Sequence, residues 1–354
     1  MTSMPDPINH VTAGVDTHRD THVAAAFDGL GRLLATGSFP VCDAGHEALV
    51  EWLEGFGPIH RVGVEGTGAW GAGLARFLTA RGIGVVEVIR PNRQSRRRNG
   101  KSDTADAIAA GRAVLSGEAD GSPRGGTGPV ESLRLLKVAR RSAMKHRTTV
   151  ANQIHSVIAT APDRLRGSLK GLSLARVLKQ ATRYRPTDLT DPYQAAKLTL
   201  RSLATRYQHL SEEIDQLDVH IAELTKTAAP NGLIELVGVG AQTASDLLIA
   251  AGSNPRRLKS EASFAALCGT SPIDASSGRQ EHHRLNRGGD RQANAALYRI
   301  VIVRLRYHQP TKDYMQRRLK EGLTKPEIIR CLKRYAAREI ATLLTKQQPQ
   351  AKAA

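Results

Sequence analysis

The sequence is poor in cysteine and in aromatic residues. Cys42, Cys268 and Cys331 are its three cysteines among 354 residues, and no two of them form a CxxC pair. This spacing argues against a zinc knuckle and is typical of reduced thiols in a cytosolic protein. Aromatic residues make up 4% of the chain, which leaves few platforms on which single-stranded bases would stack.

Long apolar runs and targeting segments are also missing. The longest apolar stretches, such as Val85 to Ile89, are far too short to span a bilayer. The segment MTSMPDPINH has no cationic region followed by an apolar run, so it does not resemble a secretory signal. We therefore expect a soluble, cytoplasmic protein with no membrane partner.

Basic residues outnumber acidic ones. The chain has 51 Lys and Arg against 33 Asp and Glu, a formal net charge of +18. Such an excess is expected of a protein whose partner carries many phosphates, so nucleic acid is the favoured partner. With 40% apolar residues, the chain can also fill the cores of two or three domains.

The first third of the chain predicts an α/β domain with a mixed sheet. Residues 11–41 predict three strands in a meander, and residues 45–89 then alternate helix, strand, helix and strand. This order is typical of an α/β fold. The basic segment 90–101 follows, and residues 102–115 predict a further helix.

Long helices are predicted beyond the glycine-rich segment 117–129. Between Leu200 and Leu224, apolar residues recur at alternating steps of three and four, as in a coiled-coil seam. This pattern favours pairing of two helices, and the alternative is an amphipathic helix packed within its own chain. The d positions are Leu203, Leu210, Leu217 and Leu224, and the a positions are Tyr207, Ile214 and Ile221.

Four acidic residues stand where a metal site would need them. Asp16 and Glu65 end two predicted strands, and Asp103 and Asp106 lie three apart in the first turn of a predicted helix. Strand ends in an α/β domain converge on one edge, and an i, i+3 pair shares one helix face. Carboxylates are the hard ligands that Mg²⁺ requires. The alternative is that these acids cap a helix, favour its dipole, or are solvated strand-end residues.

A glycine pattern after Glu65 suggests a different function. Gly66, Gly68 and Gly71 spell GxGxxG between a strand and a helix, and Glu87 follows about twenty residues later, as in a dinucleotide-binding fingerprint. However, the strand is short, an acid directly precedes the first glycine, and this is not the first strand of the domain. These features argue against a nicotinamide or flavin enzyme.

Two histidine residues near Asp16 lack the spacing of a metal site. His18 and His22 are four apart, but they fall in a strand-turn-strand region, where this spacing does not have the helical geometry of a zinc site. We expect both to be turn and surface residues.

Basic and glycine-rich segments supply candidate phosphate contacts. Residues 233–252 predict a helix, a glycine turn and a second helix, resembling a helix-hairpin-helix whose backbone N–H groups can hold a phosphate. A charge run is usually a solvated face, but one directly before the acidic pair favours contact with a nucleic-acid backbone. The candidate nucleic-acid-binding residues are Arg96, Arg97, Arg98, Lys101, Gly238, Gly240, Arg279, Arg284 and Arg287.

A pair of serines is a candidate nucleophile. Ser276 and Ser277 occupy a glycine-flanked turn ahead of the cationic stretch Arg279 to Arg291. Surrounding arginines would stabilise a phosphoryl transition state while a serine hydroxyl attacks. The alternative is that these serines are structural, as serines in turns usually are.

Taken together, these motifs resemble the DEDD transposases of the insertion-sequence family one-hundred-ten, the bridge-RNA-guided recombinases. The resemblance covers nearly the whole chain, and four motifs in this order are specific. They are GVDTHRDTHVAAAFD, VEGTGAWG, RPNRQSRRRNGKSDTADA, and LVGVGAQTASDLLIAAG through CGTSPIDASSGR.

The resemblance implies three parts. Residues 10–130 would form a RuvC-like, RNase H-type α/β domain, residues 131–229 a helical region with a coiled-coil arm, and residues 231–345 a mainly α transposase domain. Through the coiled coil, a homo-oligomer (dimer or tetramer) would assemble. A structured noncoding guide RNA would pair with donor and target DNA. The location would be the bacterial cytoplasm, at the nucleoid.

The resemblance also implies roles for single residues. The serine directly before the glycine would be the nucleophile, so we choose Ser277 over Ser276; it would attack a DNA phosphate and form a covalent phosphoserine intermediate. A RuvC-like nuclease without serine chemistry and a non-catalytic nucleic-acid-binding protein are the alternatives. The DEDD set that would bind Mg²⁺ is Asp16, Glu65, Asp103 and Asp106.

Overall fold

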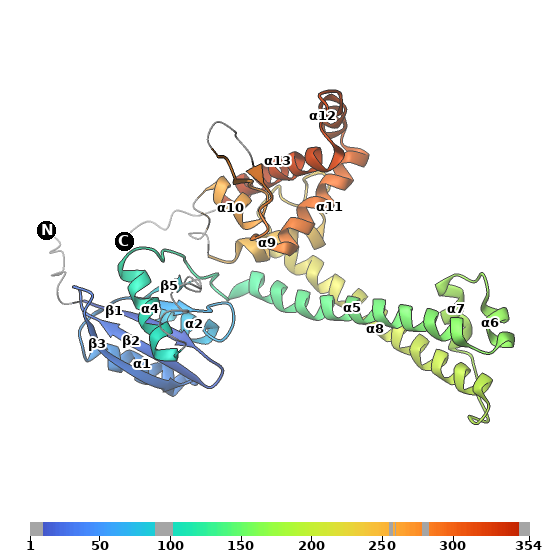
Figure 1. The fold of residues 1–354 in the computed structure, drawn as a ribbon, viewed down its shortest axis with the longest axis horizontal. Helices are drawn as coiled ribbons and strands as arrows, with labels where there is room; N and C mark the ends of the chain where they lie inside the picture. The colour runs from blue at the N-terminus through green and yellow to red at the C-terminus, as the bar shows by residue number, and fades with distance from the viewer. Residues whose placement is uncertain (1–9, 89–101, 255–257, 259, 278–282, 347–354) are drawn as a thin grey trace. The chain divides into compact units, whose positions relative to one another are not determined.

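A computed structural model describes residues 10–88, 102–254, 258, 260–277 and 283–346 (Figure 1). The chain divides into two compact units. Unit 1 comprises residues 1–128, 250–294 and 318–354, and unit 2 comprises residues 129–249 and 295–317. Within the described residues, no helix is both long and apolar enough to cross a membrane.

Unit 1 contains a five-stranded mixed sheet with the strand order β3-β2-β1-β4-β5. The first three strands pair antiparallel, whereas β4 runs parallel to β1 and β5 runs parallel to β4. This confirms the predicted mixed α/β sheet. The strands are β1 (Val11–Thr17), β2 (Thr21–Phe27), β3 (Leu33–Pro40), β4 (Ile59–Glu65) and β5 (Gly84–Val88), and the helices around the sheet are α1 (Asp43–Glu54), α2 (Ala72–Ala80) and α4 (Asp103–Leu115).

The sheet is covered on both faces, which explains why β1 is buried at every position. Val11, Ala13 and Val15 point to one face, where they share a core with leucines of α1 and α2. Val23, Ala25 and Phe27 of β2 point to the other face, where they meet Ala107 of α4. The period-two alternation of a strand therefore sends neighbouring residues into two different cores.

Glycines allow α4 to lie very close to the sheet. A Cβ atom on Gly14 of β1 would sit 2.0 Å from the Gly111 amide nitrogen and 2.2 Å from the Ala107 carbonyl oxygen of α4. A Cβ on Gly63 of β4 would meet the Val114 side chain at 2.6 Å. Real Cβ atoms essentially never come this close to another heavy atom, so β1 and β4 need glycine where α4 crosses them.

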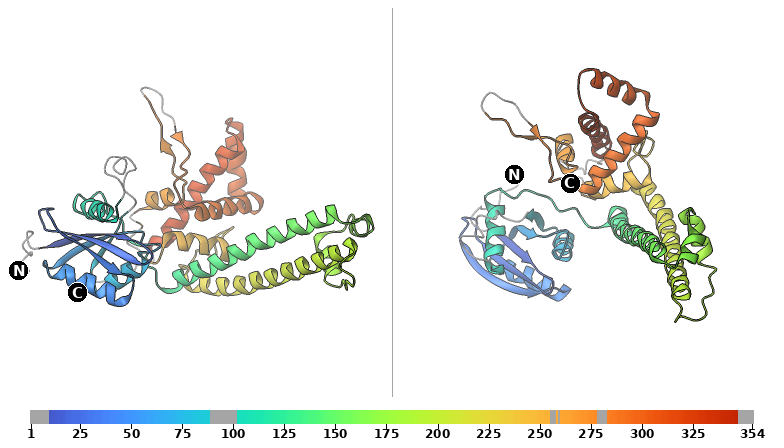
Figure 2. Two further views of the ribbon diagram at one scale, coloured as in Figure 1. Left: turned by 60° about the horizontal axis from the view of Figure 1, so that its bottom comes forward. Right: turned by 45° about the vertical axis from the view of Figure 1, so that its right-hand side comes forward.

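Unit 2 is built on two long helices that lie side by side in Figures 1 and 2. Most of the predicted seam is buried or half-buried in α8, and its N-terminal half shares a core with Val150 and Ile154 of α5. The seam thus packs at least partly within its own chain, which was the alternative to a two-chain coiled coil. The helices are α5 (Gly128–Thr160), α6 (Asp163–Leu169), α7 (Leu174–Ala181), α8 (Pro192–Ala228) and α9 (Ala241–Ala251).

The last third of the chain is mainly helical, as predicted, with one correction. Residues 231–238 form a series of turns instead of the first helix of a helix-hairpin-helix. The positive φ angles of Gly232 and Gly238 interrupt a segment that is too short to repay the cost of helix nucleation. The remaining elements are α10 (Glu261–Leu267), β6 (Ile273–Asp274), β7 (His283–Arg284), α11 (Arg291–Tyr307), α12 (Gln309–Lys320) and α13 (Lys325–Lys346).

Candidate carboxylate site

Two of the four acids end neighbouring parallel strands. In the ladder between β1 and β4, Gly14 pairs with Gly63 and Val15 pairs with Val64, so Asp16 and Glu65 come next at the same edge. The hydroxyl of Thr17 donates a hydrogen bond of 2.7 Å to the carbonyl oxygen of Glu65, which ties the two strand ends together. Because side chains alternate along a strand, Asp16 and Glu65 face the side that Gly14 and Gly63 leave open for α4.

The other two acids reach this edge from the first turn of α4. The helix is capped by Ser102, whose hydroxyl accepts a hydrogen bond from the Ala105 amide at 3.2 Å. Asp103 is therefore not the N-cap, which answers one alternative to a metal-binding role. Asp103 is exposed, whereas Asp106 is buried against the sheet.

A histidine that the sequence analysis assigned to a turn surface belongs to this cluster. The Nε2 atom of His18 lies 3.1 Å from Asp16 Oδ2 and 3.1 Å from Asp103 Oδ1. Asp16, His18 and Asp103 each offer one ligand atom, and these three atoms lie within 4.8 Å of one another. The sequence did contain a signal for this role, because His18 follows Asp16 by two residues at the end of the strand. The spacing between His18 and His22 was not informative.

The electrostatics of Asp16 reflect both burial and crowding. Burial raises the pKa of the Asp16 carboxyl, the nearby His18 lowers it, and the carboxylates of Asp106 and Asp103 raise it further. The net pKa lies above its ordinary value. Asp16 is thus close enough to both acids of α4 to interact with them. Bringing several carboxylates together in a buried place is costly unless a cation is shared among them.

His22 is a core residue, so the prediction that it lies at the surface is wrong. It is fully buried in β2 and stacks on His46 of α1, with ring centroids 5.6 Å apart. Burial, followed by His46 and His18, lowers the pKa of His22 to about 4. The tertiary packing of α1 against the sheet places this ring in the core, which no local spacing could indicate.

The glycine loop after Glu65 is a turn that supports the strand edge. Gly66 has a φ of 70°, and a Cβ on Gly71 would meet the Glu65 carbonyl oxygen at 2.8 Å. Glu87 accepts a 2.7 Å hydrogen bond from the Thr67 hydroxyl. The acid that the dinucleotide interpretation would reserve for a ribose therefore holds this loop to β5.

The serine pair lies in an exposed turn beside the short β6–β7 ribbon. The amide of Ser276 donates to Asp274 Oδ1 at 2.8 Å, and the hydroxyl of Ser276 donates to the same oxygen. These bonds lower the pKa of Asp274. Ser277 is exposed, as are Arg284 and Arg287.

Several predicted nucleic-acid contacts fall outside the described residues, namely Arg96, Arg97, Arg98, Lys101 and Arg279. The two glycines before α9 are described. Gly238 has a φ of 84° and packs against the Ile300 carbonyl oxygen, where a Cβ would approach to 2.9 Å. The Gly240 amide donates to the Thr243 hydroxyl at 3.0 Å, so this donor is used within the turn.

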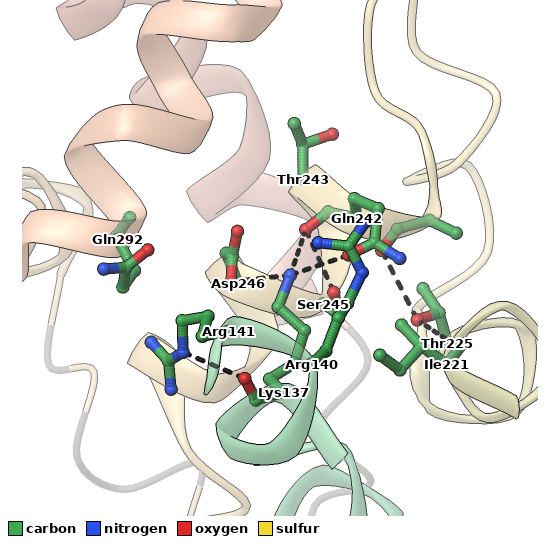
Figure 3. A network of polar contacts seen from close by, with 12 residues as sticks. Lys137, Arg140, Arg141, Ile221, Thr225, Gln242, Thr243, Ser245, Asp246 and Gln292 are labelled. Carbon is green, nitrogen blue, oxygen red and sulfur yellow. Dashed lines mark hydrogen bonds and ion pairs between the residues drawn. The ribbon is translucent and has the colours of Figure 1, made fainter. Parts of the chain in front are cut away.

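A second polar cluster lies inside unit 2 (Figure 3). Lys137 of α5 and Asp246 of α9 form a buried ion pair, with Nζ 2.9 Å from Oδ1. The same Nζ donates to the carbonyl oxygen of Gln242 at 3.1 Å and to its Oε1 at 3.0 Å. Arg140 forms a two-pronged pair with Asp218 of α8, which also accepts from Gln242. This cluster joins α5, α8 and α9.

Both regions that hold candidate catalytic residues match models of known protein families. Residues 13–161, which include all four acids, match a model for DEDD transposases of the IS110 type, described as Transposase. Residues 231–316, which include both serines, match a model described as Transposase IS116/IS110/IS902 family. The chain belongs to this transposase family. The transposase matches no curated protein. As a DNA transposase it is an enzyme of transposition and recombination, and DNA is its partner.

Proposed function

We propose that this transposase cleaves and rejoins DNA with a Mg²⁺-binding carboxylate site and a serine nucleophile, guided by a structured noncoding RNA. The carboxylate site would belong to a RuvC-like, RNase H-type domain over residues 10–130. A helical region over residues 131–229 and a transposase domain over residues 231–345 would follow. A mixed sheet with acids gathered at one strand edge is what the resemblance implies for such a domain.

One observation carries the metal proposal: acids from β1 and from α4 meet at one edge of the sheet. Ligand atoms of Asp16, His18 and Asp103 lie within 4.8 Å of one another, and Asp106 interacts electrostatically with Asp16. Carboxylate oxygens are the ligands that Mg²⁺ prefers, so Asp16, Glu65, Asp103 and Asp106 would hold it. When bound, the ion would supply charge stabilisation to a phosphoryl group.

The imidazole of His18 has two roles open to it at this site. As a metal ligand beside the carboxylates, its nitrogen would raise the affinity of the site for Mn²⁺ relative to Mg²⁺, because imidazole suits transition metals better than Mg²⁺. Otherwise, the ring would hold Asp16 and Asp103 by hydrogen bonding and would turn away when the carboxylates bind the cation. Its contacts with Asp16 and Asp103 support a place for it in the site under either role.

Ser277 would attack a DNA phosphate. Its Oγ–P bond would form as the bond from phosphorus to the leaving DNA oxygen breaks, and the serine proton would pass to water or a neighbouring base. Ser277 is chosen over Ser276 because the resemblance places the nucleophile directly before the glycine. The exposure of Ser277, Arg284 and Arg287 suits contact with a large polyanion.

The guide RNA and the homo-oligomer are the remaining parts of the proposal. A net charge of +18 suits a protein that holds RNA and DNA together. Oligomerisation would use α8 surfaces beyond those that pack on α5; Val219, for example, is an exposed apolar residue on that helix.

The proposal is tested by comparing three variants on DNA that carries the element ends, with the co-expressed RNA present. We expect Ser277→Ala to abolish covalent protein–DNA adducts in a denaturing gel while binding is retained. Ser276→Ala is the matched control and should keep adduct formation. Asp106→Ala should also stop strand cleavage. Adducts at normal yield from Ser277→Ala would refute the serine assignment.

The same experiment addresses the second candidate, a RuvC-like nuclease that uses carboxylates alone. The burial of Asp106 at the strand edge favours a metal site independently of any serine. If cleavage is lost in Asp106→Ala and unchanged in Ser277→Ala, the nuclease is the correct function.

A further inference from the structure

A cationic pocket is formed by residues of the short helix α7 and of the segments on either side of it. Figure 1 shows α7 and α6 beside the end of α5. It has a volume of about 440 Å³, within the size range of small-ligand clefts. None of the residues discussed for catalysis belongs to it. The pocket is lined by Leu172, Arg176, Lys179, Gln180, Arg183 and Tyr184.

Helix α7, which carries part of the pocket lining, is packed against the core of unit 2. Val177, Leu178 and Ala181 of α7 are buried in a core shared with α5 and α8. Arg176 and Lys179 lie on the opposite face of α7, and Arg183 lies in the turn that directly follows the helix. Because the apolar face is anchored, the three cations are held together at one surface instead of being scattered over a mobile segment.

The chain segment that carries these cations contains no acidic residue. Residues 164–187 contain seven Lys and Arg and no Asp or Glu. Among the residues that the structure describes, Arg176, Lys179 and Arg183 each make no ion pair and are exposed. By contrast, Arg166 of the neighbouring α6 is paired with Asp163. Three unbalanced cations around a cavity are suited to an anion with several oxygens.

Neutral groups in the pocket suit a nucleotide unit better than a bare inorganic anion. Gln180 supplies an amide that can both donate and accept hydrogen bonds. The Tyr184 ring borders the pocket and has Lys197 Nζ 5.4 Å from its centroid, which adds a further positive charge behind it. An aromatic wall beside cations offers a surface for a sugar or base next to its phosphate.

We propose that this pocket binds phosphodiester groups of a nucleic-acid backbone, with Arg176, Lys179 and Arg183 as the phosphate contacts. It gives the helical part of the transposase a nucleic-acid contact of its own, apart from the carboxylate site and the serine turn. The inference goes beyond the proposed function, because it holds whichever residue attacks DNA. Either DNA or RNA can supply the phosphodiester, and the experiment separates them.

The test uses full-length protein with Arg176, Lys179 and Arg183 all changed to Gln. Binding of a fluorescein-labelled DNA duplex and of a hairpin RNA with the same number of phosphates is measured by fluorescence anisotropy at several salt concentrations. We expect about tenfold weaker binding of at least one probe, and a salt dependence shallower by about 0.9 per lost contact for duplex DNA.

The matched control is the triple variant Lys145→Gln, Arg206→Gln and Lys226→Gln, which removes the same charge from exposed positions of the same unit. Loss with RNA alone assigns the pocket to RNA, loss with DNA alone assigns it to DNA, and loss with both supports shared backbone contact. Unchanged binding of both probes, or an equal loss in the control, overturns the proposal.

Thermal unfolding and the binding of a catalytic-site variant serve as further controls. Thermal unfolding midpoints should match wild type because the buried face of α7 is untouched; if the triple variant does not fold, Lys179→Gln alone is tested for the smaller change in salt dependence. The Ser277→Ala variant keeps the pocket intact, so it should bind both probes like wild type even if the serine proposal fails.

Discussion

The two polar clusters of this transposase differ in charge balance. In unit 2, the buried Asp246 is matched by Lys137, whose ammonium group also has two oxygens of Gln242 as acceptors. In unit 1, the buried Asp16 lies near the carboxylates of Asp103 and Asp106, and the imidazole of His18 is 3.1 Å from its Oδ2. Both clusters bury an aspartate, but among the described residues only the first pairs it with a lysine.

This difference separates a structural cluster from a functional one. A buried charge that is paired and hydrogen-bonded requires no further ligand. Removing one member of such a pair leaves the other charge buried and uncompensated. A buried charge with like-charged neighbours is held in place by the surrounding fold at a cost in stability, and such groups gather at sites that bind or react. If this contrast is correct, substitutions should cost the most stability at the paired cluster and the least at the carboxylate cluster.

Replacing Lys137 with Met should have the largest effect. It would leave Asp246 buried without its ammonium partner, and breaking a buried pair costs about 3–5 kcal/mol in the free energy of unfolding. Urea unfolding would measure this loss. Arg166→Met, which breaks an exposed pair with Asp163, is the control and should cost less than about 1 kcal/mol. Equal losses in both would mean that burial of the pair does not matter.

Gly14→Ala should disturb the carboxylate site through its scaffold. The new Cβ would clash with the backbone of α4 at Gly111 and Ala107, so the helix that presents Asp103 and Asp106 must move. We expect a stability loss of about 3 kcal/mol together with loss of DNA cleavage. Gly68→Ala is the control, because a Cβ there meets nothing within 4 Å. Near-wild-type stability of Gly14→Ala would contradict the close packing of α4.

His22 should make the fold sensitive to acid. Its pKa of about 4 in the folded protein lies below the ordinary 6.5, so the unfolded chain binds more protons between these values. The stability is therefore fully present above about pH 6.5 and is lost as the pH falls, by about 2 kcal/mol between pH 7 and pH 5. Urea unfolding at both pH values should show a smaller difference for His22→Leu. An unchanged difference would rule out His22 as the source.

Asp16→Asn should cost the least stability while abolishing activity. The raised pKa of Asp16 means that its ionised form is disfavoured in the folded state, so a neutral amide should leave the unfolding free energy at pH 7 unchanged or higher. Adding MgCl₂ should raise the thermal unfolding midpoint of wild type and not of the variant. Asp20→Asn, at an exposed position in the adjoining turn, should behave like wild type. Marked destabilisation by Asp16→Asn would make this cluster structural.

Much of the fold was readable from local patterns. Alternating apolar residues predicted β1 to β5, and the 3–4 spacing predicted the long helix α8. The exception, residues 231–238, is a short segment where two glycines with positive φ outweigh helix propensity. Strand ends and i, i+3 spacing were also enough to name Asp16, Glu65, Asp103 and Asp106 as candidates, because periodicity places side chains on faces before any long-range contact forms.

What the sequence by itself determined is therefore the kind of elements, the chemistry available on each and the family to which the chain belongs. Only the tertiary structure decided which groups meet. It placed His18 between Asp16 and Asp103, buried His22 against His46, turned most of the α8 seam toward its own chain and gathered three cations around a pocket beside α7. These outcomes depend on close approach between segments far apart in the chain, such as Gly14 against Gly111, and local spacing carries no record of such contacts.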